Sequence, residues 1–149
     1  MKRCLRMMVK TRTNVYDFNF HLVWVTKYRK EIFTTIEKQN AMQDMLTHIC
    51  DEHDIVIQSL QVMPDHIHML ISFHPKHAAS NIVKTLKGKS ARLWFKAYPE
   101  TKAMLWGGHL WTPSYFMLYM STVGSMSKET VKKYIENQLT EYNDGRPRT

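Results

Sequence analysis

The sequence predicts an α+β domain, because stretches with a two-residue hydrophobic period alternate with stretches of helical period and turn residues separate them. The chain has 149 residues, 44% of them hydrophobic and 23% charged, which fits one domain with its own core and excludes a multi-domain enzyme. The two cysteines, Cys4 and Cys50, do not have the spacing of a metal site, and so few cysteines are typical of the reducing cytoplasm.

The first half of the chain predicts a strand, a helix and a hairpin. Alternating apolar residues predict a strand over 16–26. Thr34 and Glu37 have the spacing of a capping box, and apolar residues then recur every three or four positions, which predicts a helix that ends near His53. A Pro-Asp turn separates two further β-rich stretches, which should pair as a hairpin: 55–62 and 66–73.

The second half predicts a helix, a strand and a last helix. The helix begins at about Ser80 and turns one apolar set toward the core: Val83, Leu86, Leu93, Trp94 and Ala97. A strand over 110–123 is interrupted by Pro113, and a final helix begins at Ser127. The order β-α-β-β-α-β followed by a helix predicts the ferredoxin-like, RRM-like antiparallel sheet with an added C-terminal helix.

The chain is strongly basic, with a formal net charge of +8 and a pI near 9.5. Polyanions are therefore the expected partners, although excess charge can also serve solubility alone. No apolar run is long enough to span a membrane, so no membrane segment is expected.

Two pairs of residues could bind a metal ion or take part in catalysis. His66 and His68 lie two positions apart in a predicted strand, so both imidazoles should project from one face, where they could hold a divalent ion or simply face solvent. Tyr134 and Gln138 lie four positions apart in the last helix and share one of its faces. The tyrosine could be a nucleophile or an ordinary packed aromatic, and the glutamine a ligand or an amide at the edge of the core.

Taken with the intervening blocks, these motifs resemble the HUH nucleases, and specifically the single-tyrosine transposases of small bacterial insertion sequences. The similarity extends from about Tyr16 to Tyr142 and includes five blocks in the family's order: 21–29 (HLVWVTKYR), 64–70 (PDHIHML), 86–90 (LKGKS), 110–116 (LWTPSYF) and 131–138 (VKKYIENQ). Residues 117–123 form a segment that is a few residues longer than is usual in the family.

The resemblance implies an enzyme that cleaves and rejoins single-stranded DNA with hairpin ends. It implies that Tyr134 attacks a phosphodiester, keeps the 5′ phosphate and releases a 3′ hydroxyl, while His66, His68 and Gln138 hold a Mg²⁺ or Mn²⁺ ion that polarises the phosphate. It further implies a homodimer whose active sites are shared between chains, and a cytoplasmic, nucleoid-associated protein of a bacterium or archaeon. The chain then divides into a basic arm (1–15), a catalytic domain (16–143) and a disordered tail (144–149).

The basic residues of the second helix and of the arm are candidates for contacts to DNA phosphates, unless they only form a solvated face. They are Lys84, Lys87, Lys89, Arg92, Lys96 and Arg12. Two other functions remain open. One is a related HUH nuclease that acts on chromosomal repeats or a replicon. The other is a non-catalytic RRM-like module, which the histidines of 66–73 disfavour because such a module carries stacking Phe or Tyr residues there.

Overall fold

The computed structural model describes residues 9–10, 15–16 and 19–120. Their elements follow in the order β1 (Val9–Lys10), β2 (Val15–Tyr16), β3 (Asn19–Val25), η1 (Lys27–Arg29), α1 (Ile36–Glu52), β4 (Val56–Met63), β5 (His66–Ser72), α2 (Ala79–Ala97), η2 (Pro99–Met104) and β6 (Phe116–Met120). The predicted helix from Ser127 lies outside the described residues, and the division of the chain into arm, domain and tail stays a prediction.

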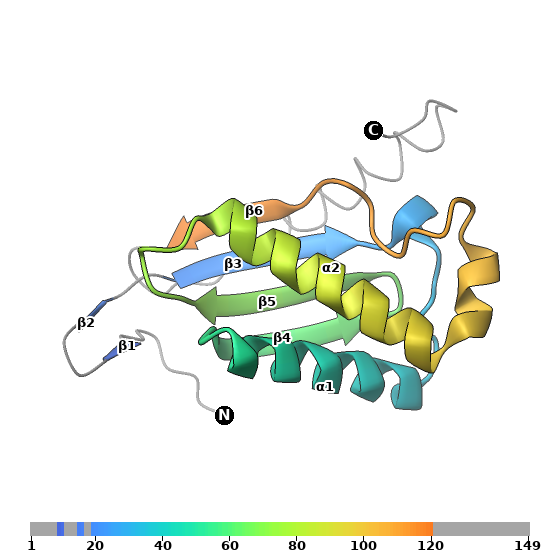
Figure 1. Ribbon diagram of the computed structural model, residues 1–149, viewed down its shortest axis with the longest axis horizontal. Coiled ribbons are helices and arrows are strands. Elements are labelled where there is room, and N and C mark those ends of the chain that lie inside the picture. Colours follow the sequence, from blue (N-terminus) through green and yellow to red (C-terminus); the bar gives the residue numbers. More distant parts are fainter. Residues whose placement is uncertain (1–8, 11–14, 17–18, 121–149) are drawn as a thin grey trace.

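The four longer strands form one antiparallel sheet in the order β4-β5-β3-β6. Both long helices, α1 and α2, pack on the same face of this sheet (Figure 1). The ferredoxin-like arrangement predicted from the sequence is therefore confirmed, with β3 and β5 as the two central strands. The short strands β1 and β2 pair with each other in a separate sheet.

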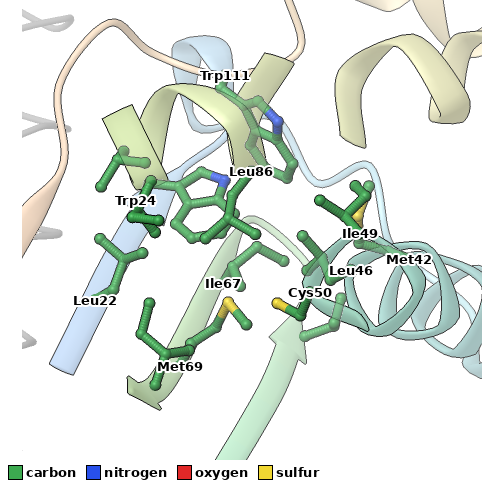
Figure 2. Packing of buried hydrophobic residues seen from close by; sticks show 14 of the residues in the cluster. Leu22, Trp24, Met42, Leu46, Ile49, Cys50, Ile67, Met69, Leu86 and Trp111 are labelled. Carbon is green, nitrogen blue, oxygen red and sulfur yellow. The ribbon is translucent and has the colours of Figure 1, made fainter. Parts of the chain in front are cut away.

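The main core lies between the sheet and the two helices. Every second residue of β3 and β5 enters it, and Figure 2 shows Trp24 of β3 and Ile67 of β5 in one cluster with Leu46 of α1. The alternation predicted for 66–73 is confirmed, because Ile67, Met69, Ile71 and Phe73 are all fully buried in this cluster. The hydrophobic effect across this layer therefore fixes which face of β5 carries the histidines.

The cap of α1 differs from the prediction. The N-cap is Thr35, whose hydroxyl accepts a hydrogen bond from the backbone N–H of Lys38, and not Thr34. The capping-box partner Glu37 thus lies in the first turn, where its charge still interacts favourably with the helix dipole. Two threonines in sequence made the start ambiguous by one residue.

Three further predictions were wrong in part. The stretch predicted as one strand over 16–26 includes Tyr16 of β2, which pairs with β1, and the separate strand β3. Ala97 at the end of α2 is exposed, although Val83 and Leu86 are buried as expected. Within 110–120, only Phe116–Met120 forms a strand, because the segment around Pro113 is irregular and Trp111 makes an isolated bridge to Thr26.

The face of β3 that points away from α1 and α2 is buried as well. Asn19, Val23 and Val25 have no exposed surface and His21 is 6% exposed. These residues alternate with the core residues of the same strand, so both faces of β3 are buried, whereas His66, His68 and Leu70 on the same face of β5 are partly exposed. Among the described residues, no helix is both long and apolar enough to cross a membrane.

Candidate active site on the second face of the sheet

The turn between β4 and β5 presents the first candidate residue and is tightly docked. The carbonyl of Pro64 accepts hydrogen bonds from the backbone N–H groups of Ile32 and Phe33, both at 3.0 Å. The carbonyl of Asp65 accepts from the N–H of Thr26 at 2.9 Å. The hairpin end that begins the His-x-His segment is thus fixed to the segment that follows β3.

His66 and His68 project from the sheet face opposite the helices. They lie opposite Val25 and Val23 of β3 in the antiparallel register, and both are partly buried. The prediction that the two imidazoles share a face is confirmed. Their role as metal ligands stays a prediction.

His66 lies in a chain of polar contacts. Its Nδ1 is 2.8 Å from Oδ1 of Asp65, and Oδ2 of the same carboxylate accepts a hydrogen bond from Nε of Arg29 at 2.7 Å. Burial alone raises the pKa of Asp65, but the hydrogen bonds from His66 and Arg29 and their charges outweigh it, so that the pKa lies below its usual value. A carboxylate next to Nδ1 leaves Nε2 of His66 as the nitrogen for a ligand.

His68 has different surroundings. Its Nε2 is 3.4 Å from Nδ1 of His21, a residue of the neighbouring strand β3. Burial, and then the charges of His21 and His66, lower the pKa of His68 to about 4. His68 is therefore neutral at physiological pH, as an imidazole must be to bind a metal ion.

His21 and Arg29 were not identified as site residues from the sequence. His21 lies at a position of the first strand that alternation assigns to the histidine face, but its neighbour depends on the strand register. Arg29 reaches Asp65 from a turn in which Tyr28 and Arg29 have φ angles of 58° and 53°. No sequence pattern predicts a left-handed turn of two such residues.

The donor set fits the ion that the resemblance implies, but only as part of a site. His66 and His68 offer imidazole nitrogens from one face, and His68 is held neutral. In the part of the chain that the structure describes, no three His, Cys, Asp or Glu side chains lie together as a metal site. The further ligand that the resemblance implies, Gln138, lies outside the described residues, as do Tyr134 and Arg12.

The basic residues of α2 fall into two groups. Lys84, Arg92 and Lys96 are exposed. Lys87 donates hydrogen bonds to the carbonyls of Thr112 and Ser114 at 2.6 and 3.0 Å, and Nζ of Lys89 is 2.8 Å from Nε2 of His53. The three exposed side chains are accessible to a ligand, whereas Lys87 and Lys89 connect α2 to neighbouring segments.

Two adjoining cavities lie along α2, each of about 320 Å³. Both are lined by Lys87, Gly88 and Pro113. Arg92 and Phe95 line the first cavity in addition, and Lys84 and Tyr115 line the second. The groove thus combines cationic and aromatic side chains.

A ferredoxin-like sheet with a His-x-His pair on one central strand agrees with the single-tyrosine HUH class that the sequence resembles. Residues 14–138 match the family model described as "Transposase IS200 like", and the chain belongs to this family. Membership implies an enzyme that cuts DNA and transfers strands.

Similar proteins carry transposase names. The ISDra2 transposase TnpA of Deinococcus radiodurans is 42% identical over 131 residues, which cover 88% of this chain and 91% of that protein. The transposase for insertion sequence element IS200 of Salmonella typhimurium is 30% identical over 126 residues, which cover 85% of this chain and 80% of that protein. A transposase crystal structure from Deinococcus radiodurans R1 aligns with a TM-score of 0.75 at 40% identity, over 88% of this chain and 98% of that one.

Proposed function

We propose that this protein cleaves and rejoins single-stranded DNA at the ends of an insertion sequence, through a covalent bond between Tyr134 and the 5′ phosphate. The observation that carries the proposal is the pair His66 and His68 on one face of a central strand, in a member of the IS200-like family. The names of the similar proteins, which are transposases of insertion elements, support an element end as the DNA substrate.

The proposed cleavage forms a bond between Tyr134 and phosphorus and breaks a bond in the DNA backbone. The phenol oxygen of Tyr134 attacks phosphorus, the bond from phosphorus to the 3′ oxygen breaks, and the proton of the phenol is balanced by the proton that the 3′ oxygen gains. A free tyrosine has a pKa near 10, so only about one in a thousand is ionised at pH 7. The covalent phosphodiester conserves the bond energy, so that rejoining requires no ATP.

His66, His68 and Gln138 are the proposed ligands of a Mg²⁺ or Mn²⁺ ion. When bound, the ion supplies a positive charge that polarises the scissile phosphate and stabilises the negative charge of the transition state. The two imidazoles hold their nitrogens toward one side of the sheet, and the nitrogen donors favour Mn²⁺ as a supporting ion.

A non-catalytic RNA-binding module is the main alternative, and the sheet disfavours it. RRM modules stack bases on aromatic side chains of their two central strands. Among the described residues, the face of β3 and β5 away from the helices carries no aromatic ring of Phe, Tyr or Trp; its residues are Asn19, His21, Val23, Val25, His66, His68, Leu70 and Ser72.

A related nuclease that processes chromosomal repeats or a replicon would use the same residues. The two functions differ in the DNA that lies beside the gene. Subterminal palindromes on both flanks support transposition of the element itself, and their absence supports the other nuclease. The proposed place of action in either case is the bacterial or archaeal nucleoid.

We propose that the exposed basic residues of α2 contact the DNA hairpin, with Arg12 and the rest of the basic arm as further contacts. Lys84, Arg92 and Lys96 are exposed, and the groove beside them offers Phe95 and Tyr115 to an unpaired base. Lys87 and Lys89 are weaker candidates for phosphate contacts because their ammonium groups already have partners within the protein.

The decisive experiment incubates the protein with a labelled single-stranded oligonucleotide that carries an element end and its hairpin. After removal of metal by EDTA and readdition of Mn²⁺, we expect a covalent protein–DNA adduct on a denaturing gel. Tyr134→Phe should bind the oligonucleotide with unchanged affinity and form no adduct. Adduct formation by Tyr134→Phe, or equal cleavage of the matching duplex, contradicts the proposal.

A further inference from the structure

We infer that Asp65 and Arg29 are positioning residues that hold the ring of His66 with its proton on Nδ1 and its Nε2 lone pair directed to the reaction site. The inference rests on the proposed role of His66 as a ligand and adds the two residues that prepare it. Neither touches the reacting atoms in this scheme. Each acts through the imidazole.

The contacts around the Asp65 carboxylate decide which nitrogen of His66 carries the proton. Oδ2 accepts a hydrogen bond from Nε of Arg29 at 2.7 Å, and Oδ1 lies 2.8 Å from Nδ1 of His66. An ionised carboxylate can only accept hydrogen bonds, so Nδ1 must be the donor. A neutral imidazole with a proton on Nδ1 has its free lone pair on Nε2, which is the arrangement that carboxylates impose on metal-binding histidines.

Asp65 is not placed to be a metal ligand itself. Both of its oxygens are engaged, one with Arg29 and one with His66, and its side chain is only 14% exposed. The Arg29 side chain, at 25% exposure, is also largely shielded from water, so the ion pair is screened less than one at the surface. The carboxylate is thus held between a permanent cation and the imidazole.

The backbone explains how Arg29 reaches this position. Tyr28 and Arg29 both lie in the left-handed region, which residues with a Cβ rarely adopt. The hydroxyl of Thr26 contacts the carbonyls of Lys30 and Asp65 at 2.6 and 3.2 Å and so ties this turn to the β4–β5 hairpin. Strained backbone of this kind persists where the surrounding contacts over-determine it, and it is concentrated at functional sites.

His68 offers an internal comparison. Among the described residues no carboxylate bonds to it, and its Nε2 lies 3.4 Å from Nδ1 of His21. Changes at Asp65 or Arg29 should therefore affect the ring of His66 and leave the ring of His68 unaltered. A merely structural role of the ion pair predicts no such difference between the two histidines.

The test uses the full-length chain and two readouts. Long-range proton–nitrogen NMR of the metal-free protein reports the tautomer of each histidine, and electron paramagnetic resonance reports the affinity for Mn²⁺. Asp65→Asn keeps the shape but replaces one of the two acceptor oxygens with an N–H₂ donor. Arg29 has only donors, so the amide oxygen should turn toward Arg29 and the N–H₂ toward His66. Nδ1 of His66 must then accept, which moves the imidazole proton to Nε2.

We expect the wild-type protein to show His66 with its proton on Nδ1. In Asp65→Asn this tautomer should be lost and Mn²⁺ affinity should fall about 10–100-fold, the usual cost of removing such a partner. Arg29→Ala should cause a smaller fall, which Arg29→Lys partly restores. Glu52→Gln is the control, because it breaks a contact of 3.3 Å with His48 on α1 without touching the site.

The inference is overturned if Asp65→Asn, shown to be folded by circular dichroism, keeps the wild-type tautomer of His66 and the wild-type affinity for Mn²⁺. Equal effects of Asp65→Asn and Glu52→Gln overturn it as well. Failure of the wild-type protein to bind Mn²⁺ contradicts the proposed function instead. The metal-free tautomer then decides the positioning role alone, since a proton on Nδ1 of His66 supports it and a proton on Nε2 overturns it.

Discussion

His66 and His68 are two positions apart in one strand, yet different residues surround their rings. A carboxylate fixes His66, whereas burial and two neighbouring imidazoles keep His68 neutral. The spacing of the histidines made their common face predictable. It did not predict their partners, because Arg29 and His21 come from segments far away in the chain.

The stability of the metal-free protein should depend on His68 between pH 6.5 and 4. The folded state lowers the pKa of His68 from 6.5 to about 4, so in this window the unfolded chain binds more protons and stability falls as the pH falls. Each pKa unit corresponds to about 1.4 kcal/mol, so the loss attributable to His68 is on the order of 3 kcal/mol.

Denaturant unfolding at pH 7 and pH 4.5, with EDTA present, measures this dependence. His68→Gln cannot gain a proton in this range and should show a clearly smaller loss of stability than the wild type. Other carboxylates and histidines titrate in both proteins, so the difference between the two isolates His68. If the free energy of unfolding depends on pH in the same way in both proteins, burial does not lower the pKa of His68 as assigned.

At the scale of elements, the start of α1 offers a matched pair of substitutions. Thr35→Ala removes the hydroxyl that accepts from the N–H of Lys38, and we expect a loss of about 1 kcal/mol in the free energy of unfolding. Thr34→Ala, one residue earlier and also exposed, should change stability by less than about 0.5 kcal/mol. Thermal unfolding of the two variants checks the assignment, and a larger effect of Thr34→Ala places the cap where the sequence predicted it.

Lys87 connects α2 to the irregular segment before β6. Its ammonium group donates to two carbonyls of that segment, and burial lowers its pKa from 10.5 to about 8. The unfolded chain therefore binds more protons between pH 8 and 10.5, so the contribution of Lys87 to stability should increase as the pH rises through this window. Lys87→Met should lack this increase, whereas Lys84→Met on the exposed side of α2 should keep it.

Elements with strong hydrophobic periodicity were predictable, and those fixed by distant partners were not. The hairpin of β4 and β5 and the buried stripe of α2 follow from local pattern and turn chemistry. The segment 110–115 is rich in β-forming residues, but its conformation is set by contacts of Trp111 with Ser90 and Thr26. Such contacts are absent from any local window of sequence.

At the scale of the whole molecule, the sheet separates a packing face from a chemical face. The helices α1 and α2 occupy one side (Figure 1). The histidines project from the other, because the residues that alternate with them in β5 are buried in the core under the helices. In the described part of the chain His66 and His68 do not form, with any other His, Cys, Asp or Glu, a group of three that could hold a metal ion. The order of elements predicted this separation, whereas the proposed ligand Gln138 and nucleophile Tyr134 lie outside the described residues.

We expect that helix to complete the histidine site of a partner chain in a homodimer, and subunit mixing tests the expectation. One chain carries His66→Ala and His68→Ala, and the other carries Tyr134→Phe. Either homodimer should be inactive. If sites are shared, half of the randomly formed dimers are mixed and each has one intact site, so cleavage should recover to about a quarter of the wild-type level.

The control mixes the two chains after each has been crosslinked as a homodimer, and it should show no recovery. If each site is built within one chain, mixed dimers contain no intact site and remain inactive even when mass spectrometry shows that they have formed. Recovery in the crosslinked control instead attributes the activity to residual function of one variant. Cleavage by the mixture requires intact histidines from one chain and an intact Tyr134 from the other. Recovered cleavage therefore reports that the active site is shared between chains, which the single variants cannot show.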